Sequence, residues 1–155
     1  MWMSECFVVL GIMAQYYQTT SPIIPGSNYA EVRKKALIYY SAIEKQTKRR
    51  PYIRSVYFKK QKVFFDYFWI HLAQKNHLIQ TERLKYLLVA VELLKYSHVQ
   101  PEIKNNPNKK NERFYRFFGI TKSRQFFGVQ IKENLTHERK FLMSVFPIKK
   151  SSANL

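Results

Sequence analysis

The chain has 155 residues, the length of one domain or of one domain with an N-terminal extension. It carries 27 Lys and Arg against 10 Asp and Glu, a formal net charge of +17, and 16% of its residues are aromatic. That aromatic content excludes a disordered basic tail, because such tails lack the apolar surface that offsets chain entropy. The single cysteine, Cys6, excludes an intramolecular disulfide framework and a cysteine-based zinc site.

The positive charge lies on both sides of a nearly neutral middle. Residues 27–62 hold 11 basic and 2 acidic side chains, residues 63–100 hold 4 and 3, and residues 101–155 hold 12 and 4. Two basic regions around an apolar centre are typical of a protein that binds a phosphate backbone, because each neutralised phosphate releases counterions. The alternative interpretation is a charged face that is only solvated.

The N-terminal region reads as an extension. Its apolar run, Cys6–Ala14, is too short to span a membrane. The only charge before this run is Glu5, whereas a secretory signal has a positive start. A buried strand, a helix or a poorly ordered extension all remain open. The segment TTSPIIPGSN then predicts a linker that ends near Ser27. We therefore expect an extension or poorly ordered linker over 1–26, one domain over 27–150 and a frayed tail over 151–155, in the cytoplasm or delivered as an effector.

Two helices are predicted from caps and apolar spacing. Asn28, with Glu31 three residues later, resembles a capping box and starts a helix that ends at about Gln46. A second amphipathic helix spans about Thr81 to Tyr96. Between them, Val56–Phe58 and Val63–Phe65 suggest a hairpin, and the stretch Tyr67–Gln74 suits a short helix.

The C-terminal third predicts strands. A polar loop over 98–111 precedes three strand-like runs, Phe114–Thr121, Gln125–Glu133 and Lys140–Phe146, and Pro147 should stop the last one. Their short connections imply an antiparallel meander. The expected fold class is α+β, with N-terminal helices packed on one face of an antiparallel β-meander of about four strands.

Alternation along these strands divides the side chains between two faces. Phe127, Val129 and Ile131 share one face, as do Phe141, Met143 and Val145, and these faces should meet the second helix. The opposite face is expected to carry Arg116, Gln130, Lys132, Lys140, Leu142 and Ser144. A basic, open sheet face suits RNA, although half of any antiparallel sheet is ordinarily polar and solvated.

The patterns RFYRFFGIT, FFGVQIKE and RKFLMSVFP, within about 114–147, resemble phage and bacterial nuclease-like domains. That group contains barnase, EndoU, colicin nucleases and RelE toxins. Its members have N-terminal helices followed by a four-stranded antiparallel meander. Their last strand tends to carry Ser or Thr followed by an aromatic residue and Pro, which Ser144, Phe146 and Pro147 match.

The resemblance implies metal-independent RNA cleavage, in which the ribose 2′-OH attacks the adjacent phosphate. Arg116 and Lys132 are then the cations that stabilise the phosphorane, and Ser144 hydrogen-bonds the phosphate or the 2′-OH. His137 or Glu133 is the acid or base; the alternatives are that His137 is only an exposed loop residue and that Glu133 pairs with a neighbouring Lys. The sequence departs from enzymes of the barnase or ribonuclease A type, because neither a Glu–His nor a His–His pair stands at an unambiguous position. RelE-type enzymes use Lys, Arg and Tyr instead, so the base stays unassigned and a binding-only protein is the alternative.

RNA is the expected partner, and the toxin-like resemblance adds an immunity protein or antitoxin. Neither a metal nor a small-molecule cofactor is expected, because acids are few and dispersed and no phosphate-binding glycine loop is present. No membrane association is expected. The side chains expected to bind the nucleic acid are Lys48, Arg49, Arg50, Lys59, Lys60, Arg113, Lys122, Arg124, Gln130 and Lys140.

Overall fold

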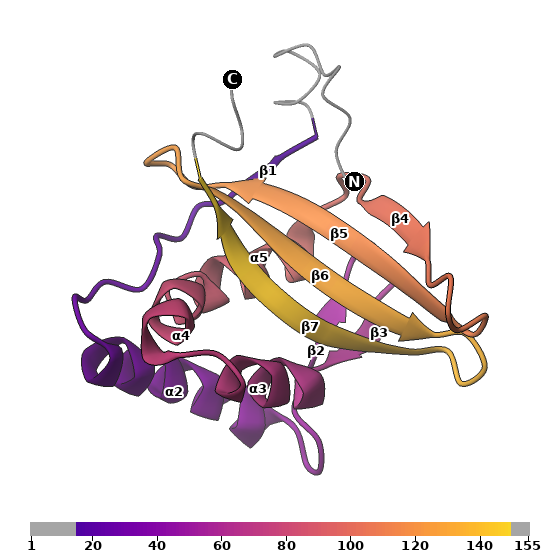
Figure 1. Ribbon diagram of the computed structural model, residues 1–155, viewed down its shortest axis with the longest axis horizontal. Helices are drawn as coiled ribbons and strands as arrows, with labels where there is room; N and C mark the ends of the chain where they lie inside the picture. The colour runs from indigo at the N-terminus through magenta and orange to yellow at the C-terminus, as the bar shows by residue number, and fades with distance from the viewer. Residues whose placement is uncertain (1–14, 150–155) are drawn as a thin grey trace.

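The structure is a computed structural model that describes residues 15–149. The apolar run over 6–14 and the expected tail over 151–155 lie outside the described residues. The α+β class is confirmed (Figure 1). In chain order the elements are β1 (Tyr17–Gln18), α2 (Tyr29–Gln46), β2 (Tyr52–Ser55), β3 (Gln61–Phe64), α3 (Asp66–Ala73), α4 (His77–Leu84), α5 (Leu87–Tyr96), β4 (Glu102–Asn105), β5 (Glu112–Ile120), β6 (Phe126–Asn134) and β7 (Arg139–Ile148).

The strands form one curled, mixed sheet with the order β1-β5-β6-β7-β3-β2, and β4 pairs with β5. β5, β6 and β7 make the expected antiparallel meander. The expectation of a four-stranded antiparallel sheet is wrong, because segments before and after α2 add strands to both edges. β1 joins β5 and β3 joins β7, each in parallel.

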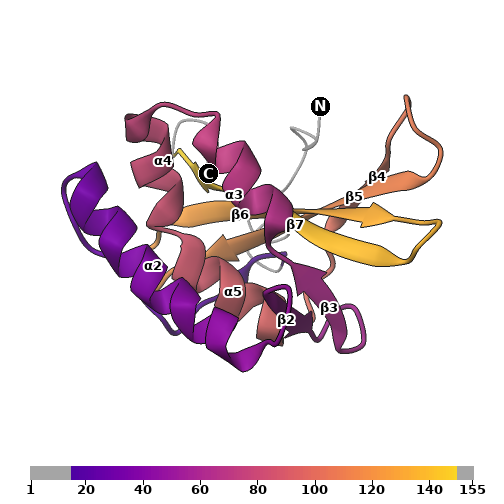
Figure 2. The same ribbon diagram turned by 90° about the horizontal axis from the view of Figure 1, so that it is seen from below.

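The expected packing of N-terminal helices on one face of the meander is also wrong. α3 and α4 contact β7, α5 contacts β2, and α2 lies on α4 and α5 as an outer layer (Figure 2). The main core fills the space between the helices and the inner face of the sheet, where Phe127, Val129 and Ile131 of β6 are fully buried as predicted. Among the described residues, no helix is long and apolar enough to cross a membrane.

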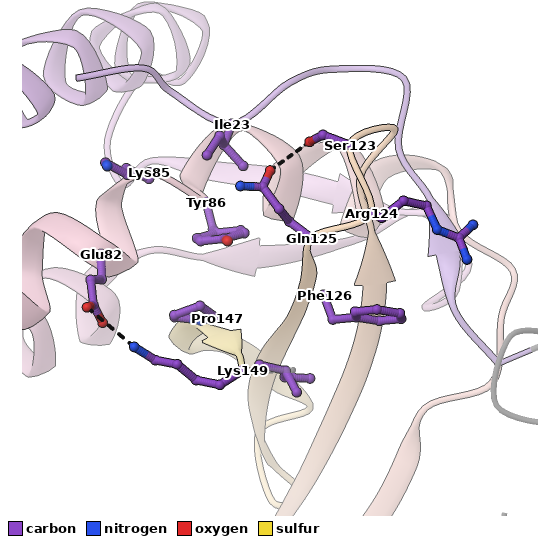
Figure 3. A pocket seen from close by; sticks show the side chains of 11 residues that line it. Ile23, Glu82, Lys85, Tyr86, Ser123, Arg124, Gln125, Phe126, Pro147 and Lys149 are labelled. Carbon is purple, nitrogen blue, oxygen red and sulfur yellow. Dashed lines mark hydrogen bonds and ion pairs between the residues drawn. The ribbon is translucent and has the colours of Figure 1, made fainter. Parts of the chain in front are cut away.

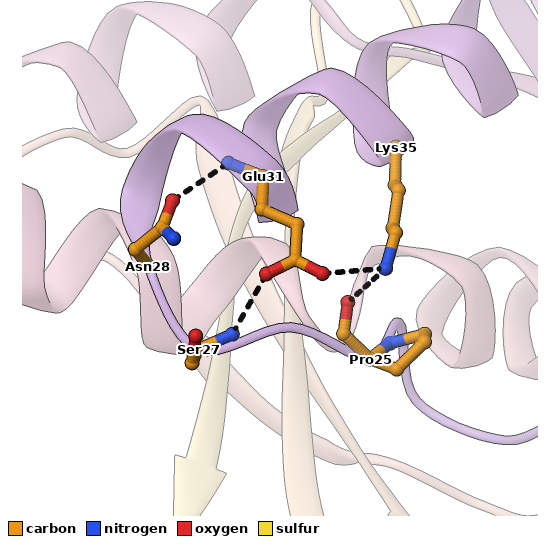
Figure 4. A network of polar contacts seen from close by, with 5 residues as sticks. All are labelled: Pro25, Ser27, Asn28, Glu31 and Lys35. Carbon is orange, nitrogen blue, oxygen red and sulfur yellow. Dashed lines mark hydrogen bonds and ion pairs between the residues drawn. The ribbon is translucent and has the colours of Figure 1, made fainter.

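The predicted start of α2 is confirmed, with one difference in its cap (Figure 4). Asn28 Oδ1 accepts a hydrogen bond from the Glu31 backbone N–H at 3.0 Å. The Glu31 carboxylate reaches back to the backbone N–H of Ser27, at 3.2 Å, rather than to that of Asn28. It also pairs with Lys35 at 3.0 Å. The cap therefore fixes the direction in which the preceding segment enters the helix.

The predicted single helix over 81–96 is wrong, because the chain breaks into α4 and α5 at Lys85 and Tyr86. At this break the Lys85 carbonyl accepts a hydrogen bond from the Ile24 backbone N–H at 2.8 Å, so its partner lies outside the helices.

The predicted short helix is confirmed as α3. The predicted hairpin is displaced: β2 and β3 flank a turn over 56–60, and the polar loop over 98–111 contains β4.

A β-bulge in β7 changes which of its side chains face the core. Gln130 of β6 lies opposite Ser144, but the next residue, Ile131, lies opposite Leu142. Leu142 is therefore fully buried in the main core, and the prediction that Phe141 and Met143 share the core face with Val145 is wrong. β7 also continues past Pro147, to Ile148.

The segment over 15–26, expected to be an extension or linker, packs on the fold. Glu92 of α5 is buried, and its carboxylate accepts hydrogen bonds from the Tyr17 hydroxyl and the backbone N–H groups of Thr20 and Ser21, at 2.8 to 3.0 Å. These bonds lower the pKa of Glu92 although burial alone raises it. They hold β1 beside the end of β5.

Candidate nucleic-acid interface and active site

A row of polar side chains crosses the outer face of the sheet, the face opposite the main core. Glu102 of β4 lies opposite Arg116 of β5, Arg116 opposite Gln130 of β6, and Gln130 opposite Ser144 of β7. Directly opposed residues point to the same face. Arg116 Nη2 donates a hydrogen bond to Gln130 Oε1 at 2.9 Å. We call Glu102, Arg116, Gln130 and Ser144 the outer-face row.

Two aromatic side chains lie near Arg116 on the outer face of the sheet. The Arg116 guanidinium lies 5.2 Å from the centroid of the Phe146 ring, and Phe118 follows two residues after Arg116 on the same face. Burial lowers the pKa of Arg116, although the nearby Glu102 carboxylate raises it. Burial also raises the pKa of Glu102, more than Arg116 lowers it. Charges in such a low-dielectric setting act more strongly on a bound anion than they do in water.

Lys132 continues the outer face two residues beyond Gln130. Its Nζ lies 3.4 Å from Glu112 Oε2 and 4.4 Å from the centroid of the Tyr67 ring, and only 17% of its side chain is exposed. It lines a pocket of about 400 Å³ between the start of α3 and the ends of β6 and β7. The predicted site residue His137 lines the same pocket, as do Arg50 and Arg139. Two of the five predicted catalytic residues, Lys132 and His137, therefore share one pocket.

A second pocket, of about 530 Å³, adjoins the first and shares Arg50 and Arg139 with it. Its lining, as far as the described residues go, contains no carboxylate and consists of Gln46, Lys48, Arg49, Arg50, Tyr52, Lys62, Phe64 and Arg139. We call the two pockets together the basic groove. The predicted residues Lys48, Arg49 and Arg50 thus lie together, beside residues of β2, β3 and β7.

Cations and aromatic rings stack in the basic groove. The Arg50 guanidinium lies 4.7 Å from the Phe64 ring centroid and is anchored by Asp66 at 2.7 Å. Lys62 Nζ lies 4.6 Å from the Tyr52 ring centroid. Positive charge beside aromatic faces is the combination that holds single-stranded nucleic acid, through phosphate contacts and base stacking.

Two predicted site residues lie on the core face of the sheet. Glu133 and Lys140 are buried on the core side, where Glu133 accepts a hydrogen bond from the Tyr115 hydroxyl at 2.6 Å and pairs with Lys140 Nζ at 2.9 Å. Burial raises the pKa of Glu133, but the hydrogen bonds from Tyr115 and Lys140 outweigh it and lower the pKa. The expected outer-face position of Lys140 is wrong because the bulge reverses the phase of β7. Its 4% exposure makes it a structural cation.

Other predicted cations lie away from the groove. Lys59 and Lys60 occupy the β2–β3 turn, both with left-handed φ of 55° and 68°. Lys122 and Arg124 lie in the β5–β6 turn, whereas His137 lies in the β6–β7 turn. These two turns are at opposite ends of β6 (Figure 1). Arg113 Nε donates a hydrogen bond to Asn105 Oδ1 at 3.1 Å, on the β4–β5 pair.

Sequence reasoning missed several residues of the site. Glu102 was missed because its segment reads as a polar loop, although the alternation in EIKN is a weak strand signal. Lys62 and Arg139 were missed because the parallel pairing of β3 with β7 has no local signature. Glu112 and Tyr67 lie at the ends of β5 and α3, where only the tertiary fold brings them to Lys132.

A further pocket, of about 520 Å³, lies between the α4–α5 break and the β5–β6 turn (Figure 3). Ile23, Tyr86 and Pro147 form part of its wall, and Lys149 at its rim pairs with Glu82 at 3.7 Å. Arg124 is its one predicted binding residue. Within the described part of the chain, no group of three or more His, Cys, Asp or Glu is arranged to hold a metal ion.

Comparison with protein-family models, curated proteins and solved structures gave no match. The functional assignment therefore depends on the geometry and charge of the outer-face row and the basic groove.

Proposed function

We propose that this protein is a metal-independent endoribonuclease whose active site lies where the outer-face row meets the basic groove. The observation that carries the proposal is the position of Lys132. It lines the groove and also stands on the sheet face two residues from Gln130. We expect an RNA strand that is bound in the groove to extend past Lys132 toward Arg116 and Ser144.

The groove supplies binding along the RNA chain. Lys48, Arg49, Lys62 and Arg139 provide charges for successive phosphates. The rings of Tyr52 and Phe64 offer surfaces for base stacking, worth about 1–3 kcal/mol per base. Both contributions tolerate many sequences, so we expect little sequence preference from the groove itself.

The outer-face row supplies the chemistry. Attack of the ribose 2′-OH on the adjacent phosphate adds negative charge to the phosphorane, which Arg116 and Lys132 are suited to stabilise. Gln130 and Ser144 offer hydrogen bonds to the same group. Removal of one such donor typically slows a reaction by about 10²–10³-fold. The products are a 2′,3′-cyclic phosphate and a 5′-hydroxyl.

RNA binding without cleavage is the second candidate. The ion pair between Glu112 and Lys132 favours it, because the carboxylate partly neutralises the cation that the reaction needs. The ribonuclease and the binding-only protein are both expected to bind RNA, but only the ribonuclease yields cleaved RNA.

The test is incubation of single-stranded RNA with the protein in EDTA, followed by analysis of the ends. The ribonuclease proposal predicts 2′,3′-cyclic phosphate ends, and a loss of cleavage of about 100-fold in Arg116→Lys, which keeps the charge but not the planar fork. Salt-sensitive binding with intact RNA would instead establish the binding-only function.

A further inference from the structure

The proposed reaction needs a group that takes the proton from the 2′-OH, and three acids or bases near the sheet are poorly suited to that step. Glu133 is on the core face and is held by Tyr115 and Lys140. Glu112 is engaged by Asn106 at 2.9 Å and by Lys132 at 3.4 Å. His137 lies in the exposed turn beyond the end of β6 rather than in the outer-face row.

Glu102 is placed differently. It is the acidic member of the outer-face row, directly opposite Arg116, and it is half-buried. Its Oε2 is buried and has no hydrogen-bond partner among the described residues. A buried carboxylate oxygen without a donor is costly to a fold, so a functional reason for it is expected. A position beside a phosphate-binding arginine supplies that reason.

We infer that Glu102 is the general base of the cleavage reaction, an assignment that rests on the proposed ribonuclease function. Its carboxylate accepts the proton of the 2′-OH while the 2′ oxygen forms the new bond to phosphorus. The bond from phosphorus to the 5′ oxygen breaks, and that oxygen takes a proton from the Lys132 ammonium group. Both side chains then return to their starting states by proton exchange with water.

The electrostatic setting suits this role. Burial raises the pKa of Glu102, and a base is more effective when its pKa lies closer to the working pH. Within residues 15–149, the groups that interact electrostatically with it are the Arg116 guanidinium on β5 and the Tyr16 phenol before β1. Arg116 opposes the rise, so RNA phosphate that engages Arg116 should raise the pKa of Glu102 further.

The test compares Glu102→Gln with Glu82→Gln, a matched change on α4 outside the outer-face row and the groove. We expect Glu102→Gln to lower kcat by at least about 100-fold and to abolish the acidic limb of the pH–rate profile. RNA affinity should stay within about twofold, and Glu82→Gln should behave like the wild type. Glu102→Asp, which keeps a carboxylate, should restore part of the rate together with the acidic limb.

The possible outcomes separate the two proposals. A folded Glu102→Gln variant that cleaves with an unchanged pH profile would overturn the assignment of Glu102 while leaving the ribonuclease function intact. If Glu102→Gln fails to fold, a folded Glu102→Asp variant that cleaves at the full wild-type rate would overturn the assignment instead. Absence of cleavage by the wild-type protein would overturn the proposed function and this assignment with it.

Discussion

Lys132 and Glu112 form an ion pair of 3.4 Å on the strands β6 and β5, at the boundary between the outer-face row and the basic groove. The Tyr67 ring lies on another side of the same ammonium group, 4.4 Å from its centroid. Burial raises the pKa of Glu112, but the hydrogen bond from Asn106 and the charge of Lys132 lower it overall, so the carboxylate stays ionised. Glu112 and Tyr67 therefore hold Lys132 in position.

The pair of Lys132 and Glu112 predicts that one substitution in the groove strengthens RNA binding. Glu112→Gln removes a negative charge from the groove and leaves Lys132 available to phosphate, so RNA binding should tighten by about fivefold at low salt, or about 1 kcal/mol. Fluorescence anisotropy with a labelled single-stranded RNA measures the change. The same substitution on the exposed turn, Glu138→Gln, serves as the control. Weaker binding by Glu112→Gln than by the control would show that RNA does not reach Lys132.

The groove cations should determine the salt dependence of binding. The double variant Lys48→Ala, Arg49→Ala should make the negative slope of log K against log salt shallower by about 1.4, because each phosphate contact on a single strand contributes about −0.7. Lys122→Ala, at the far end of the sheet, should leave the slope unchanged. An equal effect of both variants would argue for diffuse attraction to the whole basic surface instead of a groove.

Glu133 should prove structural rather than catalytic. Glu133→Gln leaves Lys140 charged and buried without its ion-pair partner, which we expect to cost about 3–5 kcal/mol in the free energy of unfolding. Because the folded pKa of Glu133 lies below its ordinary value of 4.5, its stabilisation is present above that pH and is lost as the pH falls through the folded pKa. Urea unfolding from pH 7 to pH 3 measures both effects. A fully stable variant would show that the buried pair contributes little.

The effect of Glu102 on the pH dependence of stability should have the opposite sign to that of Glu133. Its folded pKa lies above the ordinary value of 4.5, so ionisation of the Glu102 carboxyl destabilises the folded protein as the pH rises. Glu102→Gln should therefore be more stable than the wild type at pH 7 and closer to it near pH 4. Greater stability combined with lower activity is the expected property of a residue kept for function. A variant that is less stable at pH 7 would indicate a structural role for this carboxylate.

The sequence predicts most of the helices and the central strands because their signals are local. The Asn28 cap and the apolar spacing that follows it define α2, and alternation defines the core face of β6. The break between α4 and α5 was missed because the apolar stripe runs through it, whereas the Lys85 carbonyl at the break accepts a hydrogen bond from distant Ile24. Such a partner is visible only in the folded chain.

The candidate site was only partly predictable for the same reason. Arg116, Gln130 and Ser144 come together because the antiparallel register of β5, β6 and β7 follows from short turns. Lys140 was misplaced because a bulge has no signal in the sequence of β7. The basic groove could not be predicted from the sequence, because Arg50, Lys62 and Arg139 come from three separate segments of the chain. The parallel pairing of β3 with β7 brings these segments together.

The most direct test of the account compares RNA cleavage in EDTA by the wild type, Lys132→Ala and Lys109→Ala. Both lysines pair with Glu112, but Lys109 lies 3.9 Å from the carboxylate and its side chain is 66% exposed, away from the outer-face row. We expect 2′,3′-cyclic phosphate ends with the wild type and Lys109→Ala, and a rate at least about 100-fold lower with folded Lys132→Ala. Equal cleavage by the two variants, or intact RNA with the wild type, would contradict this expectation.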